Sequence, residues 1–135
     1  MGPLQSLLQQ GFGQAENYNC TEKLVYGADL AYGLHLPPPA KRMMAGFGGG
    51  MGLGLTCGAL SGAVAVISAR LVEEKAHSTP GLKPSTQQYL TAFRQKMGSL
   101  DCVELRGQYR TKEHGCDAVV QAAAAVLDEM MEQLA

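Results

Sequence analysis

The chain has 135 residues, the usual size of one domain, of which 46% are hydrophobic and 17% are charged. This composition is typical of a globular protein and excludes a disordered chain. Eleven basic and twelve acidic residues give a formal net charge of -1, which argues against nucleic acid as a partner. The longest apolar stretch, 57–69, is too short to span a bilayer. We therefore expect a single helical redox domain over residues 1–135, without membrane insertion and located in the cytoplasm.

Helical spacing and helix terminators predict three helices in the first third of the chain. Pro3 starts a short helix, because proline suits the first helical turn. A second helix is expected from about Cys20 to Gly33, with Asn17 or Asn19 as its N-cap. A short third helix runs from Pro39 to Ala45. Cys20 would then lie in the first turn of the second helix.

A glycine-rich run precedes the most apolar helix. Glycine occupies six of the nine positions in 46–54, which lets the backbone approach a neighbouring group closely. From Cys57 to Leu71, apolar residues recur at alternating steps of three and four, which is typical of a helix with one buried face. Alanine and glycine cover much of the rest of this helix. We predict that it is buried at the centre of the fold.

The C-terminal half is also predicted to be helical. Ser85 is expected to cap a helix that ends near Gly98, and 101–106 is expected to form one helical turn containing Cys102. A last helix runs over about 115–134, and no segment alternates as a strand would. The predicted fold class is all-α, a compact bundle of about five main helices with a glycine-rich loop leading into a buried central helix.

The four cysteines are the candidate functional residues. We expect no export signal, and no CxxC or CxxCH motif occurs, so the cysteines are expected to bind a metal or to do redox chemistry in a reducing compartment. Three of them, Cys20, Cys57 and Cys116, lie at or near predicted helix starts, where the helix end lowers a thiol pKa. Cys102 is the fourth. We predict that all four sulfur atoms meet in one pocket beside the glycine-rich run.

Backbone amides of the glycine-rich run are expected to surround this pocket and to donate hydrogen bonds to thiolate or bound sulfide. Close helix packing is the alternative use of these glycines, and the two uses are compatible. The predicted backbone positions around the site are Gly48, Gly49, Gly50, Gly52 and Gly58.

The remaining titratable side chains are expected to face solvent. The histidines in question are His35, His77 and His114, which we interpret as solvated before any role as ligand. The acidic residues interpreted as solvated helix faces are Glu73, Glu74, Asp128, Glu129 and Glu132.

Several segments together resemble a known family. They are Tyr18-Asn19-Cys20, the run GFGGGMG at 46–52, the run CGALSGA at 57–63, and the single cysteines Cys102 and Cys116. In this combination the chain closely resembles the C_GCAxxG_C_C family of redox-active proteins, from about residue 18 to the C-terminus. The family's defining positions fall here on Cys20, Cys57, Gly58, Ala59, Gly62, Cys102 and Cys116.

The resemblance implies an iron–sulfur cofactor. The family is similar to the cluster-bearing part of split-Soret cytochrome c, which holds a [2Fe–2S] centre, although this chain has no haem-attachment motif. An electron carrier or redox sensor with a [2Fe–2S] cluster on the four cysteines is therefore the leading expectation. Its redox partner is not identified by the sequence.

Two further functions fit the same residues. A thiol–disulfide oxidoreductase would use Cys57 as the attacking, catalytic thiol and a second cysteine to resolve the intermediate. A structural zinc protein would use all four thiolates as ligands, and inert thiols with no cofactor are a further alternative. If the chain is an enzyme, the expected class is an oxidoreductase, and the residues alone do not decide between an enzyme and a carrier. The small residues of the Cys57 helix also allow a homodimer contact.

Overall fold

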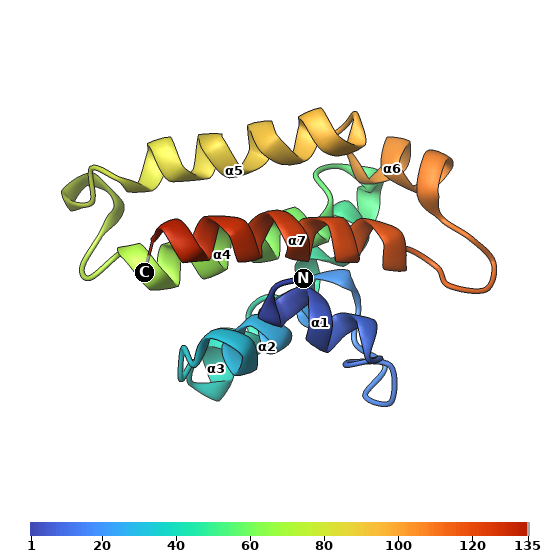
Figure 1. The fold of residues 1–135 in the computed structure, drawn as a ribbon, viewed down its shortest axis with the longest axis horizontal. Coiled ribbons are helices and arrows are strands. Elements are labelled where there is room, and N and C mark those ends of the chain that lie inside the picture. The colour runs from blue at the N-terminus through green and yellow to red at the C-terminus, as the bar shows by residue number, and fades with distance from the viewer. Residues whose placement is uncertain (135) are drawn as a thin grey trace.

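The computed structural model describes residues 1–134, which form seven α-helices and no β-strand (Figure 1). Three short helical turns, η1 (Ala45–Phe47), η2 (Gly50–Gly54) and η3 (Ala76–Ser78), lie between the helices. The predicted all-α class is confirmed. Within residues 1–134, no helix combines the length and apolar character needed to cross a membrane. The helices are α1 (Pro3–Gln9), α2 (Cys20–Tyr32), α3 (Pro38–Arg42), α4 (Gly58–Leu71), α5 (Leu82–Met97), α6 (Cys102–Tyr109) and α7 (Asp117–Gln133).

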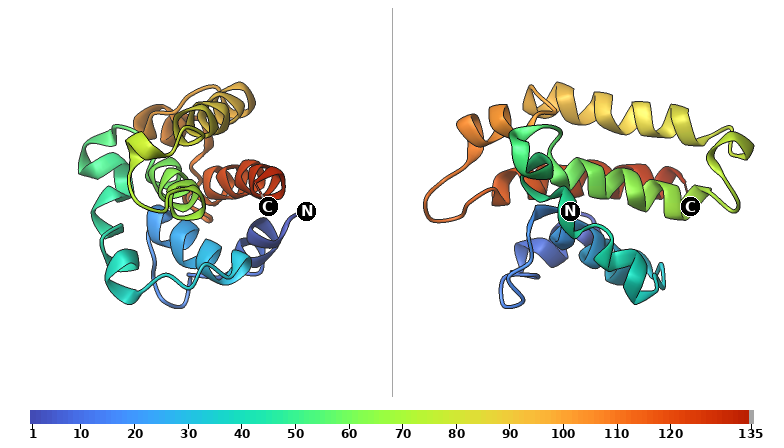
Figure 2. Two further views of the ribbon diagram at one scale, coloured as in Figure 1. Left: turned by 90° about the vertical axis from the view of Figure 1, so that its left-hand side faces the viewer. Right: turned by 180° about the vertical axis from the view of Figure 1, so that it is seen from behind.

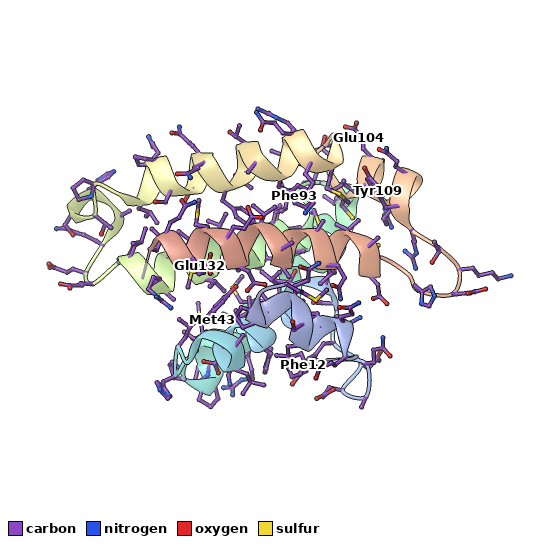
Figure 3. All side chains as sticks on the ribbon, in the orientation of Figure 1. Phe12, Met43, Phe93, Glu104, Tyr109 and Glu132 are labelled. Atoms are coloured by element: carbon purple, nitrogen blue, oxygen red, sulfur yellow. The ribbon has the colours of Figure 1, made fainter. Side chains whose placement is uncertain are left out.

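Helix α4 lies at the centre of the fold, as predicted. It packs against α2, α5 and α7, so that α4 and α7 form a middle layer with α5 on one side and α1 and α2 on the other (Figure 2). Gly62 allows the close approach of α2, because a Cβ atom there would lie 3.1 Å from Val25 Cγ2. Phe93 of α5 is fully buried and points toward α7 (Figure 3).

The start of α2 is fixed by a capping box. The Asn19 side chain accepts a hydrogen bond of 2.9 Å from the Glu22 N–H, and the Glu22 carboxylate accepts one of 2.9 Å from the Asn19 N–H. These two bonds satisfy backbone donors that a helix start leaves free. The prediction of Asn19 as the N-cap is confirmed, and Cys20 is the first residue of the helix.

Two helix starts differ from the sequence prediction. Helix α5 begins at Leu82 after Gly81, so the prediction of Ser85 as its N-cap is wrong. Pro84 lies within the first turn, where the missing N–H costs no helical hydrogen bond. Helix α6 has two turns instead of one. Asp101 holds its N-cap position without accepting a side-chain capping bond.

Asp128 is buried, so its interpretation as a solvated residue is wrong. Its carboxylate accepts hydrogen bonds of 2.9 Å from the backbone N–H groups of Leu4 and Gln5, and one of 2.7 Å from the Tyr32 hydroxyl. Burial, followed by the hydrogen bond to Asp128, raises the pKa of Tyr32. Gly2 has no room for a side chain beside this carboxylate. Asp128 therefore caps α1 from another helix and holds α1 against α2 and α7.

Candidate functional site

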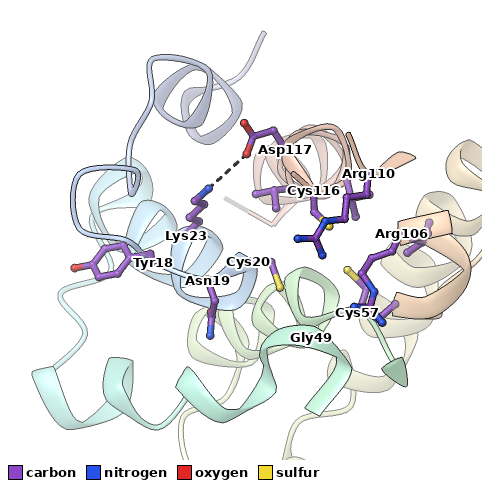
Figure 4. A pocket seen from close by; sticks show the side chains of 14 residues that line it. Tyr18, Asn19, Cys20, Lys23, Gly49, Cys57, Arg106, Arg110, Cys116 and Asp117 are labelled. Carbon is purple, nitrogen blue, oxygen red and sulfur yellow. Dashed lines mark hydrogen bonds and ion pairs between the residues drawn. The ribbon is translucent and has the colours of Figure 1, made fainter. Parts of the chain in front are cut away.

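All four cysteines line one cavity of about 340 Å³ (Figure 4). Cys57 and Cys102 are buried, with 5% and 6% of their surface exposed, whereas Cys20 and Cys116 are half-buried. Each is a free thiol. The structure thus brings together sulfur atoms that are up to 96 residues apart in the chain, as the sequence analysis predicted.

Each cysteine stands at the start of a helix. Cys20 and Cys102 are the first residues of α2 and α6, and Cys57 and Cys116 are the N-cap residues of α4 and α7. The sequence analysis counted three such positions and left out Cys102, because it expected 101–106 to be a single turn and not a helix. A helix start carries a partial positive charge and free N–H donors. Four such ends around one cavity favour an anionic occupant.

A short antiparallel bridge brings Cys57 and Cys102 side by side. Thr56 pairs with Asp101. The Cys57 N–H donates a hydrogen bond of 2.9 Å to the Leu100 carbonyl, and the Cys102 N–H donates one to the Leu55 carbonyl. Helices α4 and α6 both leave from this bridge. A pairing of single residues 45 positions apart gives no alternating pattern in the sequence, so the sequence analysis could not find it.

Two glycines are required by contacts at the cysteines. Gly50 has φ of +61°, and a Cβ atom there would lie 2.9 Å from Cys102 Cβ and against the Leu55 backbone. A Cβ atom on Gly58 would lie 2.8 Å from Cys20 Sγ and would also meet the Thr21 side chain. Both positions are too tight for any side chain without movement of the neighbours. The glycines therefore allow the helix starts to come together.

The other three predicted glycine positions differ in placement. Gly49 lines the cavity and has φ of +65°. Gly48 lies against the Asn19 side chain, and a Cβ atom on Gly52 would meet open space. Of the five predicted backbone positions, only Gly49 lines the cavity. Gly50 packs against Cys102, and Gly58 packs against Cys20.

Burial dominates the acidity of two of the thiols. It raises the pKa of Cys57 to about 11, although the backbone N–H groups of Ala59 and Leu60 lower it. Burial also raises the pKa of Cys116, against the opposing effect of Arg110. The expected lowering by the helix ends is therefore wrong for these two free thiols, because the loss of hydration outweighs the N–H donors.

The thiols also lie close enough to influence one another. Cys20 and Cys102 each raise the pKa of both Cys57 and Cys116 by charge repulsion. Repulsion between thiolates requires proximity in a poorly hydrated site. It favours an occupant that neutralises the thiolate charge.

Basic side chains were not identified from the sequence as part of this site. Lys23, Arg106 and Arg110 line the cavity, and Lys23 makes an ion pair of 3.4 Å with Asp117 across its rim (Figure 4). Among residues 1–134, neither arginine has a carboxylate within 4.0 Å. Arg106 and Arg110 follow Cys102 at steps of four, which is one face of a helix. This spacing of the two arginines relative to Cys102 was the sequence feature from which their place at the site could have been predicted.

The three histidines lie outside the cavity and are exposed, as predicted. The His114 side chain is 71% exposed and lies 3.8 Å from the Glu113 carboxylate. In the described part of the chain, no three His, Cys, Asp or Glu side chains are spaced to hold a single metal ion. The cysteines surround a cavity instead of converging on one point.

Residues 18–130 match the family described as "Putative redox-active protein (C_GCAxxG_C_C)". The match includes all four cysteines and covers most of the chain. The chain belongs to this family. No curated protein and no solved structure matches the chain significantly. Membership in the C_GCAxxG_C_C family supports redox activity as the general function.

The two classes of thiol in this C_GCAxxG_C_C protein should react at different rates. At pH 7, a pKa of about 11 leaves Cys57 with about a hundredfold less thiolate than its ordinary value of 9.0 would. Burial also restricts access to Cys57 and Cys102. In reduced, metal-free protein, iodoacetamide should therefore label Cys20 and Cys116 first, as measured by peptide mass spectrometry. The Cys57 rate should rise about tenfold per pH unit up to pH 11. Equal rates at all four positions would contradict this order.

Gly50→Ala and Gly52→Ala form a matched pair. Both place alanine at positive φ, which costs about 1–2 kcal/mol, but only the alanine at position 50 would meet Cys102 and Leu55. Overpacking adds about 1–3 kcal/mol. Gly50→Ala should therefore lower the free energy of unfolding in urea by clearly more than Gly52→Ala does. Equal losses would show that the Cys102 contact has no energetic weight.

Proposed function

We propose that this protein holds a [2Fe–2S] cluster through Cys20, Cys57, Cys102 and Cys116 and serves as an electron carrier or redox sensor. The observation that carries the proposal is the convergence of four cysteines from four helix starts on one cavity. Four cysteine thiolates are the usual ligand set of such a cluster. The free thiols suit a reducing compartment, which makes the cytoplasm the proposed location.

The charge around the cavity fits this cofactor. A cluster held by four thiolates is an anion, and the site offers four helix starts together with the guanidinium groups of Arg106 and Arg110, which have no carboxylate within 4.0 Å among residues 1–134. Each helix start contributes roughly half a positive charge at its N–H groups. The positive surroundings would offset the thiolate repulsion that acts between the cysteines. The residues present therefore fit the group that the family resemblance implies.

The chain's own residues would hold and shield the cofactor. When bound, the cluster supplies one-electron exchange. Cys57 and Cys102 lie at the buried side of the cavity, where water has little access, whereas Cys20 and Cys116 are half-buried. Ala59 and Leu60 present backbone N–H groups to the Cys57 sulfur. Such hydrogen bonds stabilise negative charge on sulfur and thereby influence the reduction potential.

A structural zinc site has less support from this geometry. Zinc needs four sulfur atoms, each about 2.3 Å from one centre. Here the sulfur atoms are distributed around a cavity of about 340 Å³. A group with two metal atoms and bridging sulfide fills such a space better than one ion does.

Thiol–disulfide exchange through Cys57 also has less support. An attacking thiol needs access and a thiolate near neutral pH. Cys57 is 5% exposed, and burial raises its pKa to about 11. The half-buried Cys20 and Cys116 have better access, but a resolving role for Cys57 would still need its thiolate.

Anaerobic reconstitution with iron and sulfide tests the proposal. We expect two iron atoms and two acid-labile sulfides per chain, with visible absorption that is lost on chelation. Metal analysis of protein isolated without added iron supplies the comparison with zinc. One zinc per chain without sulfide would assign the site to structural zinc. A chain that takes up neither iron nor zinc would contradict both the [2Fe–2S] proposal and the structural zinc alternative.

A further inference from the structure

An exposed apolar patch lies beside the cysteine cavity. Among residues 1–134, eight large hydrophobic side chains are exposed, and four of them lie close together in the fold. Met51 and Leu53 belong to η2, Leu55 follows η2 directly, and Val103 belongs to α6. A Cβ atom on Gly54 would meet the Val103 side chain, and η2 lies beside α6 (Figure 1). We call these four residues the apolar patch. Grouped exposed apolar side chains mark an interaction surface.

Met51 has a backbone conformation that disfavours a side chain. Its φ is +60° and its ψ is 32°, in the left-handed region, and glycine stands on both sides of it. Glycine would adopt this conformation without strain. The Met51 side chain is 47% exposed and adds little to the core. Its contribution is therefore expected in a contact outside the chain, and methionine suits adaptable binding surfaces.

The patch is joined through the backbone to the two buried cysteines. Val103 follows Cys102 directly, and Leu55 accepts a hydrogen bond from the Cys102 N–H. Leu55 also lies two residues before Cys57. A protein that contacts the patch would thus be separated from both buried sulfur atoms by only a few bonds.

The edge of the patch is positively charged. A Cβ atom on Gly54 would lie 3.6 Å from the Arg106 guanidinium. In the described residues, Arg106 has no carboxylate partner within 4.0 Å, and the same holds for Arg110 one turn further on. A partner with carboxylates around an apolar contact surface would complement this arrangement.

We propose that the apolar patch is the docking surface for an electron-transfer protein whose apolar contact surface is bordered by carboxylates. The inference rests on the proposed redox function of the cysteine site. One electron would pass from the partner's reduced flavin or metal centre to the centre held by the cysteines, and no atom would be transferred. Arg106 would set the orientation of the two proteins.

The probe is oxidised flavodoxin, a small acidic flavoprotein, titrated calorimetrically into anaerobically prepared full-length protein. We expect association at low ionic strength that weakens as salt is added. Met51→Gly and Leu53→Ser should each weaken it at least tenfold, and Met51→Gly should raise the melting temperature because it relieves the positive φ. Arg106→Glu should weaken binding and reduce its salt dependence.

Leu30→Ser is the matched control. Leu30 is 65% exposed on α2, ten residues beyond Cys20, or about 15 Å along the helix axis. This variant should bind like the wild type. Equal affinities of Met51→Gly, Leu53→Ser and Leu30→Ser would overturn the proposal.

Two other results would also overturn it. One is a wild-type protein that does not associate with flavodoxin at low ionic strength. The other is a wild-type dimer in sedimentation that Leu53→Ser converts to a monomer, since a second copy would then cover the patch.

The binding measurement is made with protein both before and after cluster reconstitution. Failed reconstitution would remove the proposed function, whereas the variant comparison would still decide where flavodoxin binds.

Discussion

Asp128→Ala should lower the free energy of unfolding by about 3–5 kcal/mol. The carboxylate accepts hydrogen bonds from the Leu4 and Gln5 N–H groups and from the Tyr32 hydroxyl, and it is 6% exposed. Alanine would leave the buried Leu4 donor and the part-buried Gln5 and Tyr32 donors without this partner, at a cost of about 1–3 kcal/mol for each fully buried donor and less where water can reach. Urea denaturation measures the loss. Amide hydrogen exchange should show faster opening of α1 than of α4.

The neighbouring Glu129 supplies the control. It is exposed on the same helix, so Glu129→Ala should change stability by no more than about 0.5 kcal/mol. Asp128→Asn keeps one acceptor oxygen and should fall between the two alanine variants. If Asp128→Ala cost no more than Glu129→Ala, the capping of α1 by this carboxylate would contribute nothing to stability.

Asp128 illustrates where sequence reasoning stops. Helical periodicity correctly placed the last helix. A carboxylate on an amphipathic helix is normally solvated, and its donors here are 123 and 124 residues away in the chain. Local spacing carries no information on such partners. In contrast, the Asn19 cap was predictable because all of its donors and acceptors lie within three residues.

Some features of the cysteine site could likewise be predicted from the sequence, and others could not. The cysteines themselves, the positions of three of them at helix starts and the need for glycine nearby could be predicted from local pattern. The Thr56–Asp101 bridge could not, because it joins distant segments through single residues. The raised pKa of Cys57 was missed for a different reason. Helix-end donors and burial act in opposite directions, and only the structure shows that burial is nearly complete.

Cys57→Ser and Cys102→Ser should reduce cluster retention at least tenfold, and Cys20→Ser and Cys116→Ser should reduce it less. The first two sulfur atoms are buried, so loss of either leaves an iron atom without a ligand where water has little access. At the two half-buried positions, water can also reach the vacant coordination site. Iron and sulfide per chain after anaerobic reconstitution and desalting measure the difference.

His114→Ser is the matched control for this series, because His114 lies two residues before Cys116 and its side chain is 71% exposed. It should retain iron and sulfide like the wild type. Far-ultraviolet circular dichroism separates loss of the cluster from loss of helix in each variant. Full retention in all four serine variants would show that the cysteine cavity does not hold the cluster. Equal loss in all four would show that burial does not rank the ligands, since each sulfur would then be equally indispensable.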